Sequence, residues 1–184
     1  MTLDQYRCEF EISSNRSISM PLAGALVWAF VGLVSLRLSF HSAVYVLLFS
    51  TGAILPIAML IARLRKESLL SSANPLATLM GLCVLMVNLL WGVHIPLVVY
   101  APEFAPLSIG IGLGLHWVVY SWIIRHPLGI IHAVSRTIMV VGAWYFFPEI
   151  RVTAVSVAII LAYSISLVQM LTRTVVIWPA SGRM

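Results

Sequence analysis

The chain has 184 residues, of which 61% are hydrophobic and only 9% are charged. A water-soluble domain carries about 25% charged residues, so this composition excludes a single domain that is exposed to water on all sides. The net charge of +5 does not indicate nucleic-acid binding, because the basic residues are scattered singly between apolar stretches and form no basic face.

The first part of the chain, residues 1–19, is polar and mixed in charge. It lacks the basic start and apolar core of a signal peptide, so it is predicted to be an N-terminal tail. Leu3, Tyr6 and Phe10 fall at helical spacing. Two alternatives remain for this segment: a short amphipathic helix on the membrane surface, or a frayed tail.

Six apolar stretches follow, each long enough to cross a bilayer as an α-helix. Their ranges are 20–38, 43–61, 74–100, 106–124, 127–147 and 152–171. Pro56 predicts a kink in the second stretch. The predicted fold class is therefore all-α: a polytopic membrane protein with a compact bundle of six transmembrane helices over residues 20–171 and a C-terminal tail at 172–184. The loops are too short to fold alone, so any site is expected inside the bundle or at its rims.

The basic residues of the tails and loops predict the orientation. One side of the membrane receives Arg7, Arg16, Arg63, Arg65, Lys66, Arg125, Arg173 and Arg183. The other side receives only Arg151. Cytoplasmic loops carry an excess of Lys and Arg, so both termini are predicted to be cytoplasmic.

Arg136 is the strongest candidate for a functional residue. It lies about 13 Å past Pro127 at the helical rise, near the midplane of a bilayer, where an arginine costs about 2.5–3.5 kcal/mol. No Asp or Glu lies in the six stretches, so Arg136 could bond backbone carbonyls, reach toward the interface or meet an anionic ligand. His132 lies one turn away on the same face. Together with His116 and Asn88, these residues form the predicted ligand-binding set.

Other polar and small residues are expected to have structural roles. Arg37, His41 and His94 are assigned to the outer rim, where Arg37 could reach the membrane interface. Gly110 and Gly114 have the spacing of a small-residue face, which predicts close packing between helices.

The sequence contains no nucleophile–base–acid set, no paired carboxylates and no phosphate-binding loop. The five histidines have no metal-ligand spacing, so no metal site is predicted. No cofactor and no catalytic residue is predicted.

The order of features resembles a family of small bacterial membrane proteins with about six helices and no assigned function. The resemblance lies in AGALVWAFVGL after the polar tail, NPLATLMGL after a basic loop, and PEFAPLSIGIGLGLHWVVYSWI across the third loop and the fourth helix. It implies a bacterial cytoplasmic membrane and supports His116 and Trp117 as a unit with the Pro-Glu loop before them.

Three function classes remain open. The first is a small transporter or channel for a polar or anionic solute, and the second is a non-catalytic accessory protein that binds another membrane protein or lipid. The third is an intramembrane lipid-modifying enzyme, which the residues support least. Membrane lipids are expected partners, and the thin bundle is compatible with a homodimer.

Overall fold

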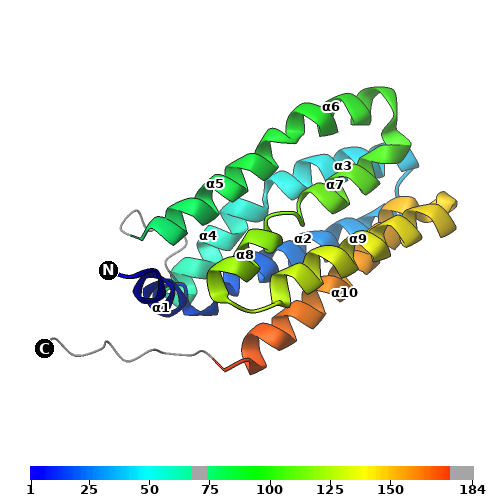
Figure 1. Cartoon of the computed structure of the whole chain (residues 1–184). Helices are drawn as coiled ribbons and strands as arrows, with labels where there is room; N and C mark the ends of the chain where they lie inside the picture. The colour runs from blue at the N-terminus through cyan, green and yellow to red at the C-terminus, as the bar shows by residue number, and fades with distance from the viewer. Residues whose placement is uncertain (68–73, 175–184) are drawn as a thin grey trace, which may run out of the picture.

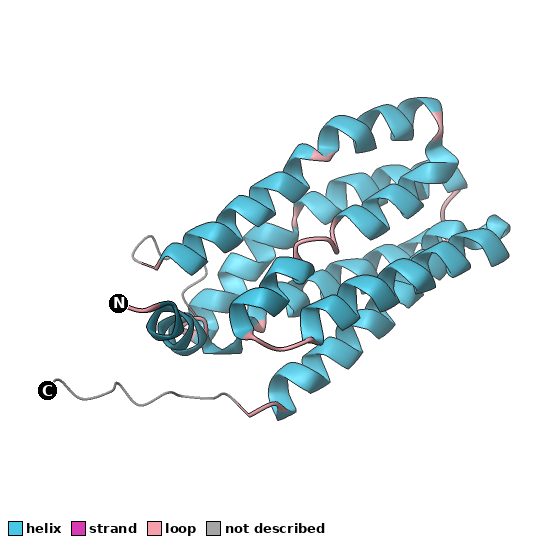
Figure 2. Ribbon diagram, viewed as in Figure 1, coloured by secondary structure: helices cyan, strands magenta, loops and turns pink. Residues whose placement is uncertain are grey.

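The computed structural model describes residues 1–67 and 74–174, and all regular structure within these ranges is helical (Figures 1 and 2). The all-α fold class is therefore confirmed. The α-helices are α1 (Leu3–Ser13), α2 (Ser19–Ser35), α3 (Phe40–Gly52), α4 (Ile54–Arg65), α5 (Pro75–Leu89), α6 (Trp91–Tyr100), α7 (Ala105–Gly112), α8 (Trp117–Ile124), α9 (Leu128–Phe146) and α10 (Arg151–Thr172). Short 3₁₀ helices, η1 (Asn15–Ser17), η2 (Pro102–Phe104) and η3 (Pro148–Ile150), precede α2, α7 and α10.

Several helical segments are long and apolar enough to cross a membrane. Among the described residues there are five, namely Asn15–Ser35, Pro75–Tyr100, Pro102–Ile124, Leu128–Phe146 and Pro148–Thr172. The pair α3 and α4, which meet at 41°, makes a sixth if it is counted as one span. Large apolar side chains are exposed on their outer faces, as at Phe30, Phe49, Leu89, Ile138 and Val168. Such a surface is better suited to lipid than to water.

Three of these segments are interrupted partway. The first interruption is at Ala53, between α3 and α4. Pro56 explains it, because a proline has no N–H to donate and its ring clashes with the carbonyl four residues earlier, which here belongs to Gly52. The bend predicted for Pro56 therefore lies about one turn before that residue. The second interruption, at Leu90 between α5 and α6, is a single residue.

The third interruption, between α7 and α8, lies in a glycine-rich stretch. Here the backbone tightens, because the amide of Gly114 donates to the carbonyl of Ile111 at 2.8 Å and the amide of Leu115 donates to that of Gly112 at 3.2 Å. Both bonds join residues three apart, as in a 3₁₀ helix. The carbonyl of Gly110 is thereby free for a side-chain donor.

The remaining helices, α2, α9 and α10, are continuous and lie side by side (Figure 1). Small residues bring α2 close to α10. A Cβ on Gly24 would lie 2.6 Å from the hydroxyl of Tyr163, and one on Gly32 would lie 3.0 Å from Cβ of Ser156. Only glycine permits this approach, so α2 and α10 form a tightly packed side of the bundle.

Residues Leu3–Ser13 of the predicted tail form a helix, α1, which begins with a capping box at Thr2. It packs across one end of the bundle rather than standing free, because Phe10 is buried and joins the core. Glu11 accepts a hydrogen bond from Arg173 at 2.6 Å, which ties α1 to the residue that follows α10. The N-terminus and the C-terminal end of α10 both lie at this end (Figure 1).

Candidate functional site

Arg136 lies on α9 and is fully buried, with 0% of its surface exposed. Its Nε donates a hydrogen bond to the free carbonyl of Gly110 at 2.8 Å. The two terminal nitrogens make no hydrogen bond to any residue that the structure describes. The rings of Tyr163 and Trp28 lie 5.2 Å and 6.0 Å from Cζ, so aromatic faces supply part of the stabilisation that water would give.

The interruption between α7 and α8 makes room for this guanidinium. A Cβ on Gly114 would lie 2.9 Å from Cδ of Arg136 and 3.1 Å from Nε. The sequence predicts close helix packing at Gly110 and Gly114; Gly114 lies in the turn between α7 and α8, where it packs against Arg136 of α9. Gly110 does pack against neighbouring helices, since a Cβ there would lie 3.0 Å from Val140 and 3.2 Å from Val155.

His132 lies one turn before Arg136 on α9 and is also buried. Its ring stacks on Trp117 with the centroids 4.0 Å apart, and its Nδ1 lies 2.8 Å from Oγ of Ser166. Its other nitrogen, Nε2, has no partner among the described residues. The ring of Tyr163 lies 5.1 Å away, so α8, α9 and α10 meet at this aromatic cluster.

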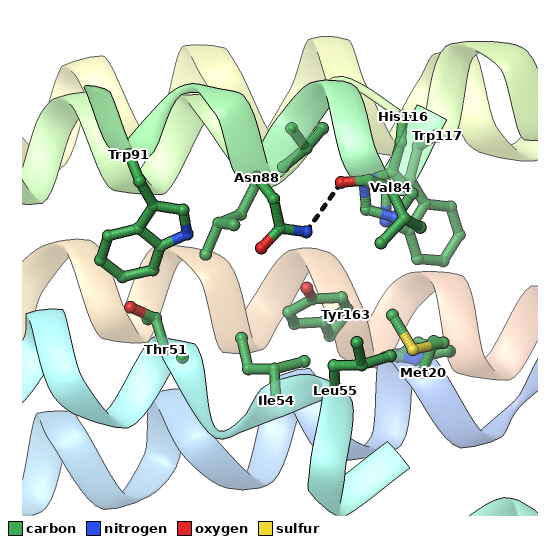
Figure 3. A pocket seen from close by; sticks show the side chains of 14 residues that line it. Met20, Thr51, Ile54, Leu55, Val84, Asn88, Trp91, His116, Trp117 and Tyr163 are labelled. Atoms are coloured by element: carbon green, nitrogen blue, oxygen red, sulfur yellow. Dashed lines mark hydrogen bonds between the residues drawn. The ribbon is translucent and has the colours of Figure 1, made fainter. Parts of the chain in front are cut away.

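A small cavity, which we call the inner chamber, lies beside this cluster and has a volume of about 70 Å³ (Figure 3). Residues at or next to all three helix interruptions form its wall. They are Thr51, Gly52, Ile54 and Leu55 from α3 and α4, Val84, Val87, Asn88 and Trp91 from α5 and α6, and Leu113, His116 and Trp117 from α7 and α8. Met20 and Pro21 of α2 and Tyr163 of α10 complete it.

The inner chamber presents a few neutral polar groups. Asn88 donates its amide to the carbonyl of Val84 at 2.8 Å, which leaves its side-chain oxygen for a ligand (Figure 3). Nδ1 of His116 is buried without a hydrogen-bond partner in the described part of the chain. Tyr163 is the side chain that both lines the chamber and faces Arg136. The chamber therefore has a few polar groups in a mostly apolar wall, and a buried positive charge lies behind Tyr163.

A larger cavity, the outer chamber, adjoins the inner one and has a volume of about 360 Å³. The two share lining residues, among them Val84, Asn88, His116 and Trp117. The outer chamber extends toward α1, because Phe10, Ser14 and Ser17 are also in its wall. The remaining lining is mostly apolar and comes from α2, α4, α5, α8 and α10.

Three residues that the sequence assigned to the outer rim are divided by the structure. Arg37 and His41 are exposed in and next to the turn between α2 and α3. His94 is instead 1% exposed, with Nδ1 2.9 Å from Oγ of Ser108, so it joins α6 to α7 inside the bundle. The burial of His94 could not be predicted, because the sequence does not show which side of a helix its neighbours cover.

The sequence analysis did not identify the aromatic residues that surround Arg136. Trp28, Trp117 and Tyr163 are almost completely buried, although tryptophans near helix ends and tyrosines in helices are commonly interfacial. Spacing alone does not bring them together, since they come from α2, α8 and α10. One signal was present: Gly24 lies four residues before Trp28 on α2, and a glycine in an apolar helix often admits a large side chain from a neighbour.

Within the described ranges, no three His, Cys, Asp or Glu side chains come together as a metal-binding group. Comparison with curated proteins and with solved structures gives no match. A protein-family model does match, and it covers residues 3–173, which include every helix and both chambers. The chain therefore belongs to this family, which is described as a family of unknown function (DUF7010).

Proposed function

We propose that this chain is an integral membrane protein that binds a small polar or anionic solute in the inner chamber as a step in its transport. The observation that carries the proposal is the meeting of three interrupted helices at one cavity. Transporters commonly build their substrate sites from discontinuous helices near the middle of the membrane, where unwound backbone lines a cavity. The location at the bundle's interior, beside Arg136, is in keeping with such a site.

The charge of Arg136 supports an anionic or electron-rich solute. Its guanidinium is buried with both terminal nitrogens unpaired among the described residues, and the hydration it has lost is replaced by one hydrogen bond and two aromatic faces. Such burial is costly. An anion or a polar group in the chamber would lower that cost through the low-dielectric interior. In a purely structural role, a carboxylate or several carbonyls would be expected around the charge.

In this proposal both termini are cytoplasmic and the membrane is a bacterial cytoplasmic membrane. The support is the excess of Lys and Arg at the end of the bundle that α1 crosses, where Arg125 and Arg173 pair with Asp4 and Glu11. Solute would then pass between that end and the opposite rim, where Arg37 and His41 are exposed.

Filling the inner chamber is the direct test. Gly52 lines it, and a Cβ at this position would meet nothing within 4 Å, so Gly52→Leu should occupy the space without displacing the backbone. Gly92→Leu is the matched control, because Gly92 is exposed on α6, lines neither chamber and also has open space around its Cβ.

The measurement is thermal unfolding of each protein in lipid nanodiscs against formate, acetate, nitrate, chloride, urea and glycerol. A solute that binds only the folded state at 100 times its Kd stabilises it by about 2.7 kcal/mol. We expect at least one anion to stabilise the wild type and Gly92→Leu but not Gly52→Leu. Uptake of that anion into proteoliposomes should likewise occur with the wild type and Gly92→Leu but not with Gly52→Leu. Equal responses of Gly52→Leu and Gly92→Leu would reject the inner chamber as the site.

A further inference from the structure

The two chambers differ in polarity along their length. The outer chamber is lined chiefly by apolar side chains, including Leu55, Met80, Val84 and Leu85. Polar groups gather at its inner end, where Asn88 and His116 border the inner chamber. A molecule that occupied both chambers would therefore need an apolar body and a polar end.

The polar end cannot be a cation. Arg136 lies behind Tyr163, and a second positive charge in a low-dielectric interior would be repelled strongly. The lining of the two chambers includes no carboxylate in the described part of the chain that would offset this repulsion. A carboxylate or a hydroxyl, in contrast, can accept or donate hydrogen bonds at Asn88, His116 and Tyr163.

The apolar body must be extended, because the outer chamber runs along α5 between this helix and residues of α2, α4, α8 and α10. It extends from His116 to Phe10 and passes Gly81, where the absence of a side chain widens the space: a Cβ there would meet nothing within 4 Å. Both Tyr120 and Met170 border the same path. An unbranched alkyl chain can lie along an apolar lining that extends from His116 to Phe10.

We infer that the ligand of the two chambers is a single-chain amphiphile. Its neutral or anionic end lies at Asn88, His116 and Tyr163, and its unbranched apolar chain lies in the outer chamber. This inference rests on the proposed function and names the class of its substrate.

The test is a series of n-alkanoates from acetate to decanoate, added to the protein in nanodiscs of uncharged lipid, with thermal unfolding as the readout. Each methylene buried in the outer chamber should lower the apparent Kd about fourfold. The n-alkanol of equal length should also bind, and the n-alkylammonium should not. An alkylammonium that stabilised the protein as well as the alkanoate would overturn the inference.

Gly81→Leu distinguishes binding of the alkyl chain in the outer chamber from its partition into the surrounding lipid. In this variant the short acids should bind within about twofold of the wild type, while the gain with chain length disappears. Gly92→Leu should keep the wild-type dependence. Partition of long chains into the bilayer affects all three proteins equally, so identical chain-length dependence in wild type and Gly81→Leu would also overturn the inference.

Tyr163→Phe tests the orientation of the ligand. It should reduce the advantage in apparent affinity of alkanoate over alkylammonium, while the dependence of affinity on chain length is preserved. An unchanged advantage would mean that the polar end lies elsewhere, contrary to the inference. The two proposals fail in different ways. If no short acid binds the wild type, the proposed function fails, whereas a flat chain-length series with acetate still bound rejects the amphiphile alone.

Discussion

The two sides of the bundle are built by different rules. On one side, α2, α9 and α10 are continuous and closely packed, and Gly24 and Gly32 of α2 are in contact with side chains of α10. On the other, α3–α4, α5–α6 and α7–α8 are interrupted, and Gly52, Gly81 and Gly92 have open space beside them. Arg136 and Tyr163, the proposed binding groups, thus come from the closely packed side, while most of the lining of the inner chamber comes from the interrupted side.

This division matters because a site needs side chains held in fixed positions and a cavity that remains empty without a ligand. A closely packed helix pair holds side chains in fixed positions but leaves no cavity between its helices. An interrupted helix leaves backbone groups and gaps that neighbouring segments do not fill. The two sides should therefore respond very differently to substitution.

The largest effect is expected at Gly129, in the first turn of α9. A Cβ there would collide with the backbone carbonyl of Trp117 and lie 3.0 Å from Oγ of Ser121. Because backbone must move, Gly129→Ala should lower the free energy of unfolding by about 3 kcal/mol. Urea titration in mild detergent would measure this, with Gly92→Ala as the control. A loss below about 0.5 kcal/mol would remove the claim that α9 is closely packed against α8.

A smaller effect of opposite sign is expected at Arg136. Replacing it with a long apolar side chain, in Arg136→Met, removes a buried charge whose terminal nitrogens have no partner among the residues that the structure describes. The free energy of unfolding should rise by about 1–2 kcal/mol, because removing an imperfectly compensated buried charge is often stabilising. The stabilisation by small anions should disappear in the same variant. If Arg136→Met is strongly destabilised and still responds to anions, Arg136 is a structural residue.

The smallest effect is expected at Gly81, on the interrupted side. Gly81→Ala adds one methyl group in open space on α5, so it should raise the free energy of unfolding by about 0.5–1 kcal/mol through the better helix propensity of alanine. Unfolding of the two proteins in the same detergent would show it. A destabilisation of similar size would mean that the outer chamber is narrower than the structure has it.

The positions of the helices follow well from the sequence, because about twenty apolar residues have few other ways to bury their backbone in lipid. The interruptions follow less well. Pro56 indicates the interruption between α3 and α4, since a proline affects the backbone locally, although the bend lies at Ala53. At Leu90 no residue type in the sequence indicates the interruption between α5 and α6. At Leu113 and Gly114 the decisive event is a hydrogen bond from Arg136 to Gly110, which joins residues 26 positions apart.

The candidate site was likewise predictable from the sequence only in part. Arg136 stands out in the sequence because a charge in an apolar stretch is rare, and His132 follows from helical spacing. Trp28, Trp117 and Tyr163 do not stand out, since aromatic residues are common in such helices and only the packing of α2, α8 and α10 brings them together. The burial of His94 is not predictable for the same reason, because its partner Ser108 lies on a different helix.

The contact between Glu11 and Arg173 has a consequence for the order in which the molecule is completed. The two residues are 162 positions apart, so α1 leaves the ribosome first and waits for nearly the whole chain before its partner is made. Domains begin to form from the N-terminus during synthesis, and contacts of this separation close last. An unfinished chain that stops before Arg173 would leave Glu11 without this partner. Closure of this pair therefore marks a chain in which α10 has been synthesised and docked.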